Sequence, residues 1–148
     1  MNQMKTVTLI TVAAAALTLT TTSCSKEGQP VKAEPSKALS SQLNAEFETV
    51  KGRWLRPDGG YVIELKALLP DNQVTAAYFN PGPINVGEAK IYKENGFLKV
   101  FVKMQDKNYP GSAYTLIYDK ENDQLRGIYF QAVQGVEYEV EFTRLPQE

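Results

Sequence analysis

The side chains that carry out most enzymatic chemistry are scarce in this sequence, which has no histidine and a single cysteine, Cys24. Histidine is the usual general base at neutral pH and a frequent ligand of transition metals. The sequence also has no glycine-rich phosphate loop and no serine in a nucleophile-elbow pattern. No two acidic residues share inward positions on neighbouring predicted strands, where a catalytic carboxylate pair would lie. We therefore expect a protein that is not an enzyme and that uses no metal ion or cofactor.

Tyrosine, arginine and amide side chains provide a different chemistry, that of ligand binding. Six residues at or near predicted turns supply one cation with several phenol and amide groups: Arg56, Tyr61, Tyr78, Asn80, Tyr109 and Gln131. If the fold brings them together, such groups bind a small apolar or amphipathic ligand through ring contacts and hydrogen bonds. The alternative is ordinary turn chemistry, because Asp58-Gly59-Gly60 and Asn80-Pro81-Gly82 are good turn sequences by themselves.

The elements that position these side chains are strands, because apolar residues recur with a period of two after Gly52. The clearest example is 136–144, where apolar residues alternate with three glutamates. Such alternation indicates a strand with one buried face and one solvated face. We predict eight strands, at 52–56, 60–67, 73–79, 85–93, 97–105, 113–119, 125–131 and 136–144.

Short turns separate these strands, and no predicted helix interrupts them. We therefore predict an all-β fold, an eight-stranded antiparallel up-and-down barrel of the calycin type. A two-sheet sandwich is the competing fold, and it would need longer crossovers than this sequence contains. In a meander, successive loops alternate between the two ends of the barrel. One end, the predicted mouth, thus collects four loops rich in Pro and Gly: 57–60, 80–84, 106–112 and 132–135.

The segment Gly52-Arg53-Trp54 resembles the Gly-x-Trp signature of lipocalins and related calycin-like barrels. The resemblance covers the chain from the first strand to the last as an architecture. It implies that Arg144, which points inward at the end of the last strand, stacks across Trp54 at the closed end. It also implies that a ligand enters through the loops of the mouth. The alternative is that Trp54 and Arg144 are only a core aromatic residue and its polar lid.

Strand parity directs many aromatic side chains into the barrel. The inward positions are Trp54, Tyr61, Tyr114, Tyr118, Tyr129 and Tyr138. These rings either line a cavity or fill it, because eight strands enclose an interior that side chains can occupy entirely. In the first case we expect a binding protein. In the second we expect a structural or accessory envelope protein that acts through protein–protein contacts.

The N-terminus has the three regions of a secretory signal peptide: a charged start, an apolar stretch and small residues up to Ser23. The segment Leu19-Thr20-Thr21-Thr22-Ser23-Cys24 resembles a bacterial lipobox. The resemblance implies cleavage before Cys24, lipid attachment there and anchoring of the protein to a membrane of the cell envelope. Ser25 stands where, in similar lipoproteins, Asp implies inner-membrane retention, so an outer membrane is favoured. The alternative is a secreted protein with one unpaired cysteine.

The domain organisation follows from these segments. After the signal peptide at 1–23, a Pro- and charge-rich tether occupies 24–36. Apolar residues spaced by three or four then predict a short amphipathic helix at 37–50, followed by the barrel at 51–148. The net charge of −1 argues against a nucleic-acid partner, which needs a basic face. The expected partners are therefore the membrane, a small ligand and an envelope protein.

Overall fold

The computed structural model describes residues 35–146, with side chains from residue 39 onward. A helix, α1 (Pro35–Val50), precedes nine strands and a short 3-10 turn. The later elements are β1 (Gly52–Arg56), β2 (Tyr61–Leu68), η1 (Pro70–Asn72), β3 (Val74–Asn80), β4 (Gly82–Ile84), β5 (Val86–Glu94), β6 (Phe97–Asp106), β7 (Tyr109–Asp119), β8 (Gln124–Gln131) and β9 (Val136–Arg144). The predicted signal peptide and Cys24 lie outside the described residues, as does the tether up to residue 34. Within residues 35–146, no helix has the length and apolar character needed to cross a membrane.

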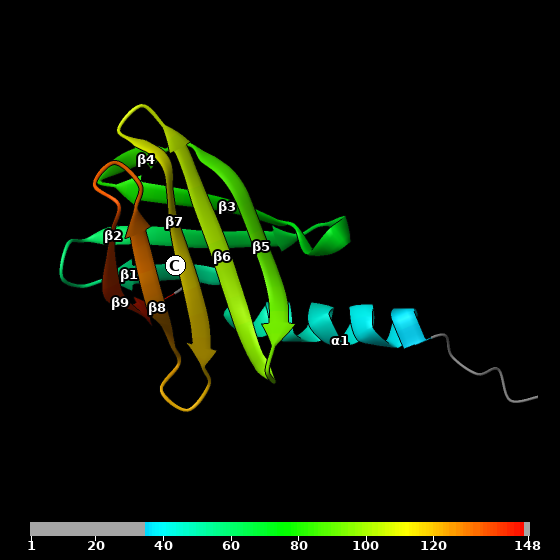
Figure 1. Cartoon of the computed structure of the whole chain (residues 1–148). Helices are drawn as coiled ribbons and strands as arrows, with labels where there is room; N and C mark the ends of the chain where they lie inside the picture. Colours follow the sequence, from blue (N-terminus) through cyan, green and yellow to red (C-terminus); the bar gives the residue numbers. More distant parts are fainter. Residues whose placement is uncertain (1–34, 147–148) are drawn as a thin grey trace, which may run out of the picture. The chain divides into compact units, whose positions relative to one another are not determined.

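All nine strands form one sheet in the order β4-β3-β2-β1-β9-β8-β7-β6-β5, and every neighbouring pair is antiparallel. The first and last strands pair through Trp54↔Arg144 and Leu55↔Thr143, which joins the two halves of the sheet. The other two edges of the sheet are connected in the described residues by one isolated bridge, Gln73↔Lys90, in which Gln73 directly precedes β3 and Lys90 belongs to β5. The predicted all-β, up-and-down architecture with a preceding helix is therefore confirmed as a nearly closed barrel (Figure 1).

The structure corrects the strand count, because the predicted loop at 80–84 contains a ninth strand. After Asn80 the chain turns at Pro81, and β4 pairs back on β3 with Phe79 opposite Pro83. Proline is tolerated there because β4 is an edge strand, whose outer side needs no ladder hydrogen bond. The predicted loop at 106–112 is also too long. The ladder of β6 and β7 continues to the pair Asp106↔Tyr109, which leaves a two-residue turn.

Burial follows the predicted period of two along most strands. On β6, residues 98, 100, 102 and 104 are all buried, while the residues between them are partly exposed. The pattern stops at the start of β9, where Val136 and Tyr138 point to the inner face but are 40% and 42% exposed. The β8–β9 hairpin therefore reaches beyond the packed part of the barrel.

Helix α1 covers one end of the barrel with its apolar face. Leu43, Phe47 and Val50 are buried in the core, whereas Leu39 is exposed. An ion pair of 2.6 Å between Glu46 and Lys93 connects the helix to the end of β5. The helix begins two residues before the predicted start at 37 and ends where predicted, at Val50.

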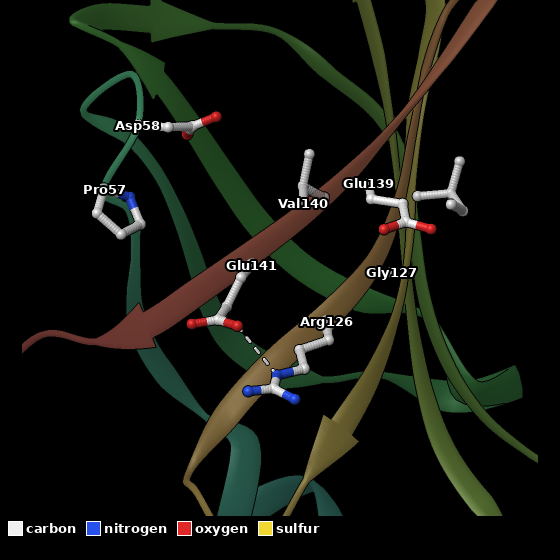
Figure 2. Close-up of a pocket in the computed structure, with 8 residues that line it drawn as sticks. Pro57, Asp58, Arg126, Gly127, Glu139, Val140 and Glu141 are labelled. Atoms are coloured by element: carbon white, nitrogen blue, oxygen red, sulfur yellow. Dashed lines mark ion pairs between the residues drawn. The ribbon is translucent and has the colours of Figure 1, made fainter.

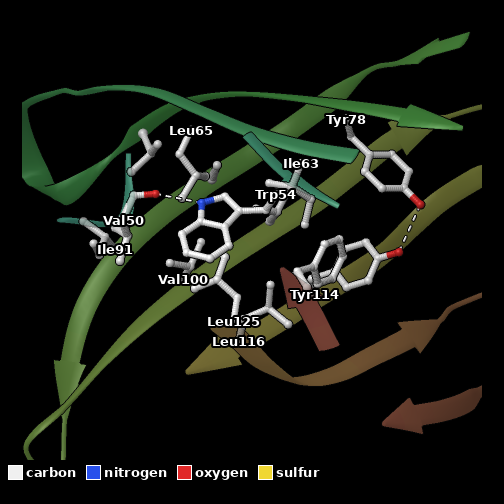
Figure 3. Close-up of a cluster of buried hydrophobic side chains, with 14 of the residues drawn as sticks. Val50, Trp54, Ile63, Leu65, Tyr78, Ile91, Val100, Tyr114, Leu116 and Leu125 are labelled. Atoms are coloured by element: carbon white, nitrogen blue, oxygen red, sulfur yellow. Dashed lines mark hydrogen bonds between the residues drawn. The ribbon is translucent and has the colours of Figure 1, made fainter. Parts of the chain in front are cut away.

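Trp54 and Arg144 hold the end of α1 against the barrel. The indole Nε1 of Trp54 donates to the carbonyl of Val50 at 2.8 Å, and the guanidinium of Arg144 lies 4.1 Å from the centre of the indole ring. Arg144 also donates to the carbonyls of Thr49 (2.7 Å) and Lys51 (2.9 Å). A cation at a helix C-terminus donates hydrogen bonds to carbonyls that have no partner within the helix, and it interacts favourably with the negative end of the helix dipole. Figure 3 shows Trp54 within the buried cluster, bonded to Val50.

Candidate ligand-binding site

The end of the barrel opposite α1 contains a pocket, which we call the mouth pocket. The loops after β1, β3, β6 and β8 lie at this end (Figure 1), because only Asn85 separates β4 from β5 and the two run in the same direction, as one strand of the meander. The pocket has a volume of about 230 Å³. Its lining consists of Arg56, Tyr61, Tyr78, Tyr109, Tyr114, Tyr129, Gln131 and Tyr138.

Strand ends position this lining. Arg56 is the last residue of β1 and Tyr61 the first of β2, so the β1–β2 turn holds them opposite each other in register. Tyr129 and Tyr138 face each other in the same way across β8 and β9. Because side chains alternate along a strand, Tyr129, Gln131 and Tyr138 face inward while their chain neighbours face outward. On β7 a register shift between Ala113 and Pro110 reverses the alternation, and this places Tyr109 on the inner face together with Tyr114.

Five of the six predicted ligand-site residues line the mouth pocket: Arg56, Tyr61, Tyr78, Tyr109 and Gln131. The sixth, Asn80, does not line it, but its amide Nδ2 donates to the hydroxyl of Tyr109 and so orients that ring. Three lining tyrosines were expected to point inward but were not assigned to the ligand site: Tyr114, Tyr129 and Tyr138. The strand parity of these three residues was a sufficient signal for including them.

The tyrosine rings of the mouth pocket contact one another in a continuous array. Tyr114 stacks on Tyr129 with ring centres 4.7 Å apart, and Tyr129 stacks on the exposed Tyr138 at 6.3 Å. Across the pocket, Tyr61 stacks on Tyr78 at 6.4 Å. At the floor, the hydroxyls of Tyr78 and Tyr114 share a hydrogen bond of 3.0 Å (Figure 3). The array presents ring faces and phenol groups together, a combination that suits ligands with both apolar and polar parts.

Arg56 is the only formally charged residue in the lining of the mouth pocket. Its Nε and Nη2 atoms donate to the two carboxylate oxygens of Asp58, each at 2.7 Å. The guanidinium carbon lies 4.9 Å from the ring centre of Tyr61 and 5.9 Å from that of Tyr129. The side chain of Arg56 is 13% exposed, whereas that of Asp58 is 61% exposed. The cation therefore lies between aromatic rings at the pocket wall, and its counter-ion lies toward solvent.

Three phenols of the mouth pocket, those of Tyr78, Tyr114 and Tyr129, are neutral at physiological pH. Burial raises the pKa of Tyr114 to about 12, and it raises the pKa of Tyr78 and Tyr129 as well. Neutral phenols keep their O–H groups, so they can donate hydrogen bonds to a ligand as well as accept them. The hydrogen bond from Arg56 lowers the pKa of Asp58, which keeps that carboxylate charged.

Below the mouth pocket the barrel is packed with side chains. Trp54, Leu116 and Leu125 are fully buried in one continuous cluster that reaches from α1 to Tyr78 and Tyr114 (Figure 3). The two earlier alternatives thus apply to different halves of the barrel. Side chains fill the closed half, and they line a pocket in the open half.

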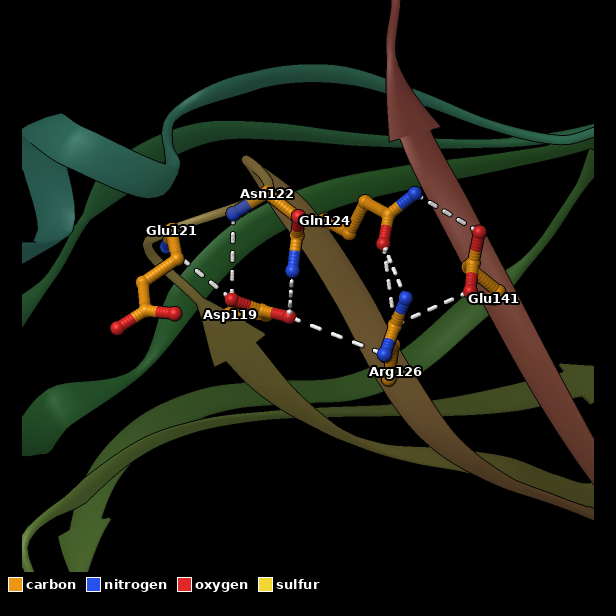
Figure 4. A network of polar contacts seen from close by, with 6 residues as sticks. All are labelled: Asp119, Glu121, Asn122, Gln124, Arg126 and Glu141. Atoms are coloured by element: carbon orange, nitrogen blue, oxygen red, sulfur yellow. Dashed lines mark hydrogen bonds and ion pairs between the residues drawn. The ribbon is translucent and has the colours of Figure 1, made fainter.

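A wider hollow of about 600 Å³ lies on the outer face of β8 and β9 (Figure 2). Three of its four charged groups are already paired, since Arg126 contacts Glu141 at 3.0 Å and Asp58 contacts Arg56 at 2.7 Å. Figure 4 shows that Gln124 contacts both members of this pair and that Arg126 also reaches Asp119 at 3.9 Å. Asp119 stands at the turn after β7, where its carboxylate accepts two backbone N–H groups. Within the described chain, no group of three or more His, Cys, Asp or Glu residues is arranged to hold a metal ion. The mouth pocket is therefore the better candidate for a ligand.

Comparisons of the chain with protein-family models, with curated proteins and with solved structures found no match. The kind of ligand that the mouth pocket binds is therefore inferred from its lining residues.

Proposed function

We propose that this protein is a lipid-anchored cell-envelope binding protein, lipocalin-like in its barrel, that binds a small amphipathic ligand in the mouth pocket. The observation that carries the proposal is the convergence of one arginine, six tyrosines and one glutamine on a single pocket. The sequence around Cys24 supports lipid attachment, and Ser25 favours an outer membrane. A tethered barrel is held near the membrane surface, where amphipathic molecules are concentrated.

The size and lining of the mouth pocket limit what it accommodates. Its volume of about 230 Å³ is below the range of about 300–1,000 Å³ that is usual for drug-sized ligands. A single ring or a compact head group therefore fits, and the rest of a larger molecule must extend out of the mouth.

An apolar surface lies where the remainder of such a ligand would emerge. Val136 and Tyr138 are exposed on the inner face of β9, and Val133 is exposed in the adjoining turn. An apolar tail that covered these side chains would gain about 25 cal/mol for each Å² of apolar surface removed from water. The ligand we propose thus places a polar head among the phenols and an apolar part against the β8–β9 hairpin.

Native mass spectrometry of the full chain purified from its host is the direct test. We expect a bound small molecule in the wild type and a reduced bound fraction in Tyr138→Ala, which removes one wall of the mouth pocket. The matched control is Tyr92→Ala, since Tyr92 lies on the outer face of β5. A wild-type protein without bound molecules, or equal occupancy in both variants, would contradict ligand binding at the mouth.

The lipid anchor needs its own experiment. Metabolic labelling with a fatty-acid analogue should mark the wild-type chain and leave Cys24→Ala unlabelled. Label that persists after this substitution would refute the anchor while leaving the mouth pocket unaffected.

The exposed β8–β9 hairpin favours a second candidate function, that of an accessory envelope protein that contacts a protein partner. Phe130, Val133 and Val136 are exposed there and could form such a contact. In that case Val133→Asp should abolish co-purification of an envelope protein, and the mouth pocket should contain no ligand.

A further inference from the structure

We propose that the mouth pocket selects ligands with an anionic group, a carboxylate or a phosphate, and that Arg56 binds this group while Asp58 weakens the binding. This inference rests on the proposed function and names the class of ligand. It assigns opposite effects to two neighbouring residues of the β1–β2 turn, which makes it testable by substitution.

The charge of the lining favours an anion. Arg56 provides the only formal charge among the eight lining residues, and no carboxylate belongs to the lining. A guanidinium has five N–H donors, and the two hydrogen bonds to Asp58 use only two of them. Arg56 also interacts with the hydroxyl of Tyr114, and its contacts with Tyr61 and Tyr129 are with the ring faces and use no donor. Donors therefore remain for a ligand, and planar guanidinium groups bind carboxylate and phosphate oxygens well.

The aromatic rings of the mouth pocket disfavour a cationic ligand. Rings of this kind often bind ammonium groups on their faces. Here Arg56 itself lies over Tyr61 and near Tyr129, so a cation already uses these faces. A second cation in the same pocket would be repelled by the guanidinium.

The neutral tyrosines complete a site for an anion. Because their pKa values are raised, Tyr78, Tyr114 and Tyr129 keep their protons and add no negative charge. The hydroxyl of Tyr129 and the one hydroxyl proton that the Tyr78–Tyr114 hydrogen bond leaves free can donate to the oxygens of the anion, and the ring faces can contact an attached ring.

Asp58 modulates the site from outside the pocket. Its side chain is 61% exposed and its two carboxylate oxygens accept hydrogen bonds from Arg56 at 2.7 Å. This pairing orients the guanidinium, but the negative charge offsets the attraction for a bound anion. Asp58→Asn retains an oxygen acceptor of the same shape and removes the charge. It should therefore tighten anion binding by about two- to fivefold, the effect expected of an exposed charge pair.

The test is calorimetric titration of the full chain with three single-ring probes: benzoate, phenyl phosphate and the neutral benzamide. We expect both anions to bind the wild type more tightly than benzamide, and the stronger of the two identifies the preferred anion. Arg56→Gln should weaken anion binding by about tenfold or more, since a hydrogen bond to a charged group is lost. Arg53→Gln is the matched control, because it removes the same charge from an exposed position on the same strand.

Each outcome bears on one of the two claims. Equal affinities for benzoate and benzamide in the wild type would overturn the anion inference while supporting a ligand site at the mouth. Failure of all three probes to bind would contradict the proposed function and the inference with it. If Arg56→Gln does not fold, the Asp58→Asn variant still tests the inference. Unchanged or weaker anion binding in that variant would overturn it.

Discussion

Replacing Trp54 by alanine should severely destabilise the barrel, because this side chain connects three parts of the structure. The indole is 0% exposed, and its Nε1 donates to Val50 at the end of α1. Tyr118 contacts it edge-on with ring centres 6.1 Å apart, and Arg144 covers one face. The substitution therefore removes core volume and also loosens the contact between the helix and the first and last strands.

The magnitude follows from the contacts that are lost. Truncating a buried Trp to alanine costs about 3–5 kcal/mol. The cation–π contact with Arg144 contributes about 0.5–2 kcal/mol and the hydrogen bond to Val50 about 0.5–1.5 kcal/mol. These contributions overlap, so we expect a loss of about 4–6 kcal/mol in the free energy of unfolding. The total free energy of unfolding of a domain of this size is about 5–15 kcal/mol, so the variant should be close to unfolding.

Urea unfolding monitored by far-ultraviolet circular dichroism is the suitable assay. Fluorescence is unsuitable because Trp54 is the only tryptophan in the chain. Tyr92→Ala is the control, since it truncates an aromatic ring on the outer face of β5 and should cost about 1 kcal/mol or less. A loss below about 1 kcal/mol for Trp54→Ala would refute the role assigned to this residue, since no buried tryptophan is removed at so small a cost.

Three further predictions concern single sites. The hydrogen bond from Arg144 lowers the pKa of Asp123, so the stability that this pair contributes is present above about pH 4 and is lost as the pH falls through the lowered pKa. Asp123→Asn should therefore reduce the decrease of the melting temperature at acid pH. An unchanged decrease would contradict the pairing. Gly127→Ala should cost about 1–3 kcal/mol in a chemical denaturation curve, because a Cβ there would clash with a carbonyl of β7. Gly82→Ala is its neutral control, with no atom within 4 Å of the added Cβ. Tyr78→Phe should cost about 1–3 kcal/mol in the same assay, because it leaves a buried hydroxyl without its partner, and a stabilised variant would contradict that bond.

The strands could be predicted from the sequence because their signal is local. Leu98, Val100 and Val102 alternate with neighbours that are at least partly exposed, and the same alternation determines which face is buried. The short strand Gly82–Ile84 could not be predicted in this way, because three residues with a proline carry no period. It forms only because the turn at Pro81 returns the chain to the unpaired edge of β3.

The candidate site could be predicted in part for the same reason. Turn composition placed Arg56, Tyr61 and Tyr109 at one end of the barrel, and strand parity directed the tyrosines inward. Sequence reasoning could not separate residues that line the pocket from those that support it. Asn80 belongs to the second group, because its position relative to Tyr109 depends on how β3 and β7 approach across the barrel.

The sequence by itself determined the faces of the strands and the end of the barrel at which the tyrosines gather, because both follow from periodicity and loop order. Only the tertiary structure decided how deep the pocket is and how its charge is arranged. Its depth depends on Tyr78 and Tyr114, which come from distant strands and meet through their hydroxyls to form the floor. Its electrostatics depend on Arg56, which is held among ring faces while its partner Asp58 remains in solvent. Contacts of this kind join residues far apart in the chain or set the depth of a side chain, and no local pattern specifies them.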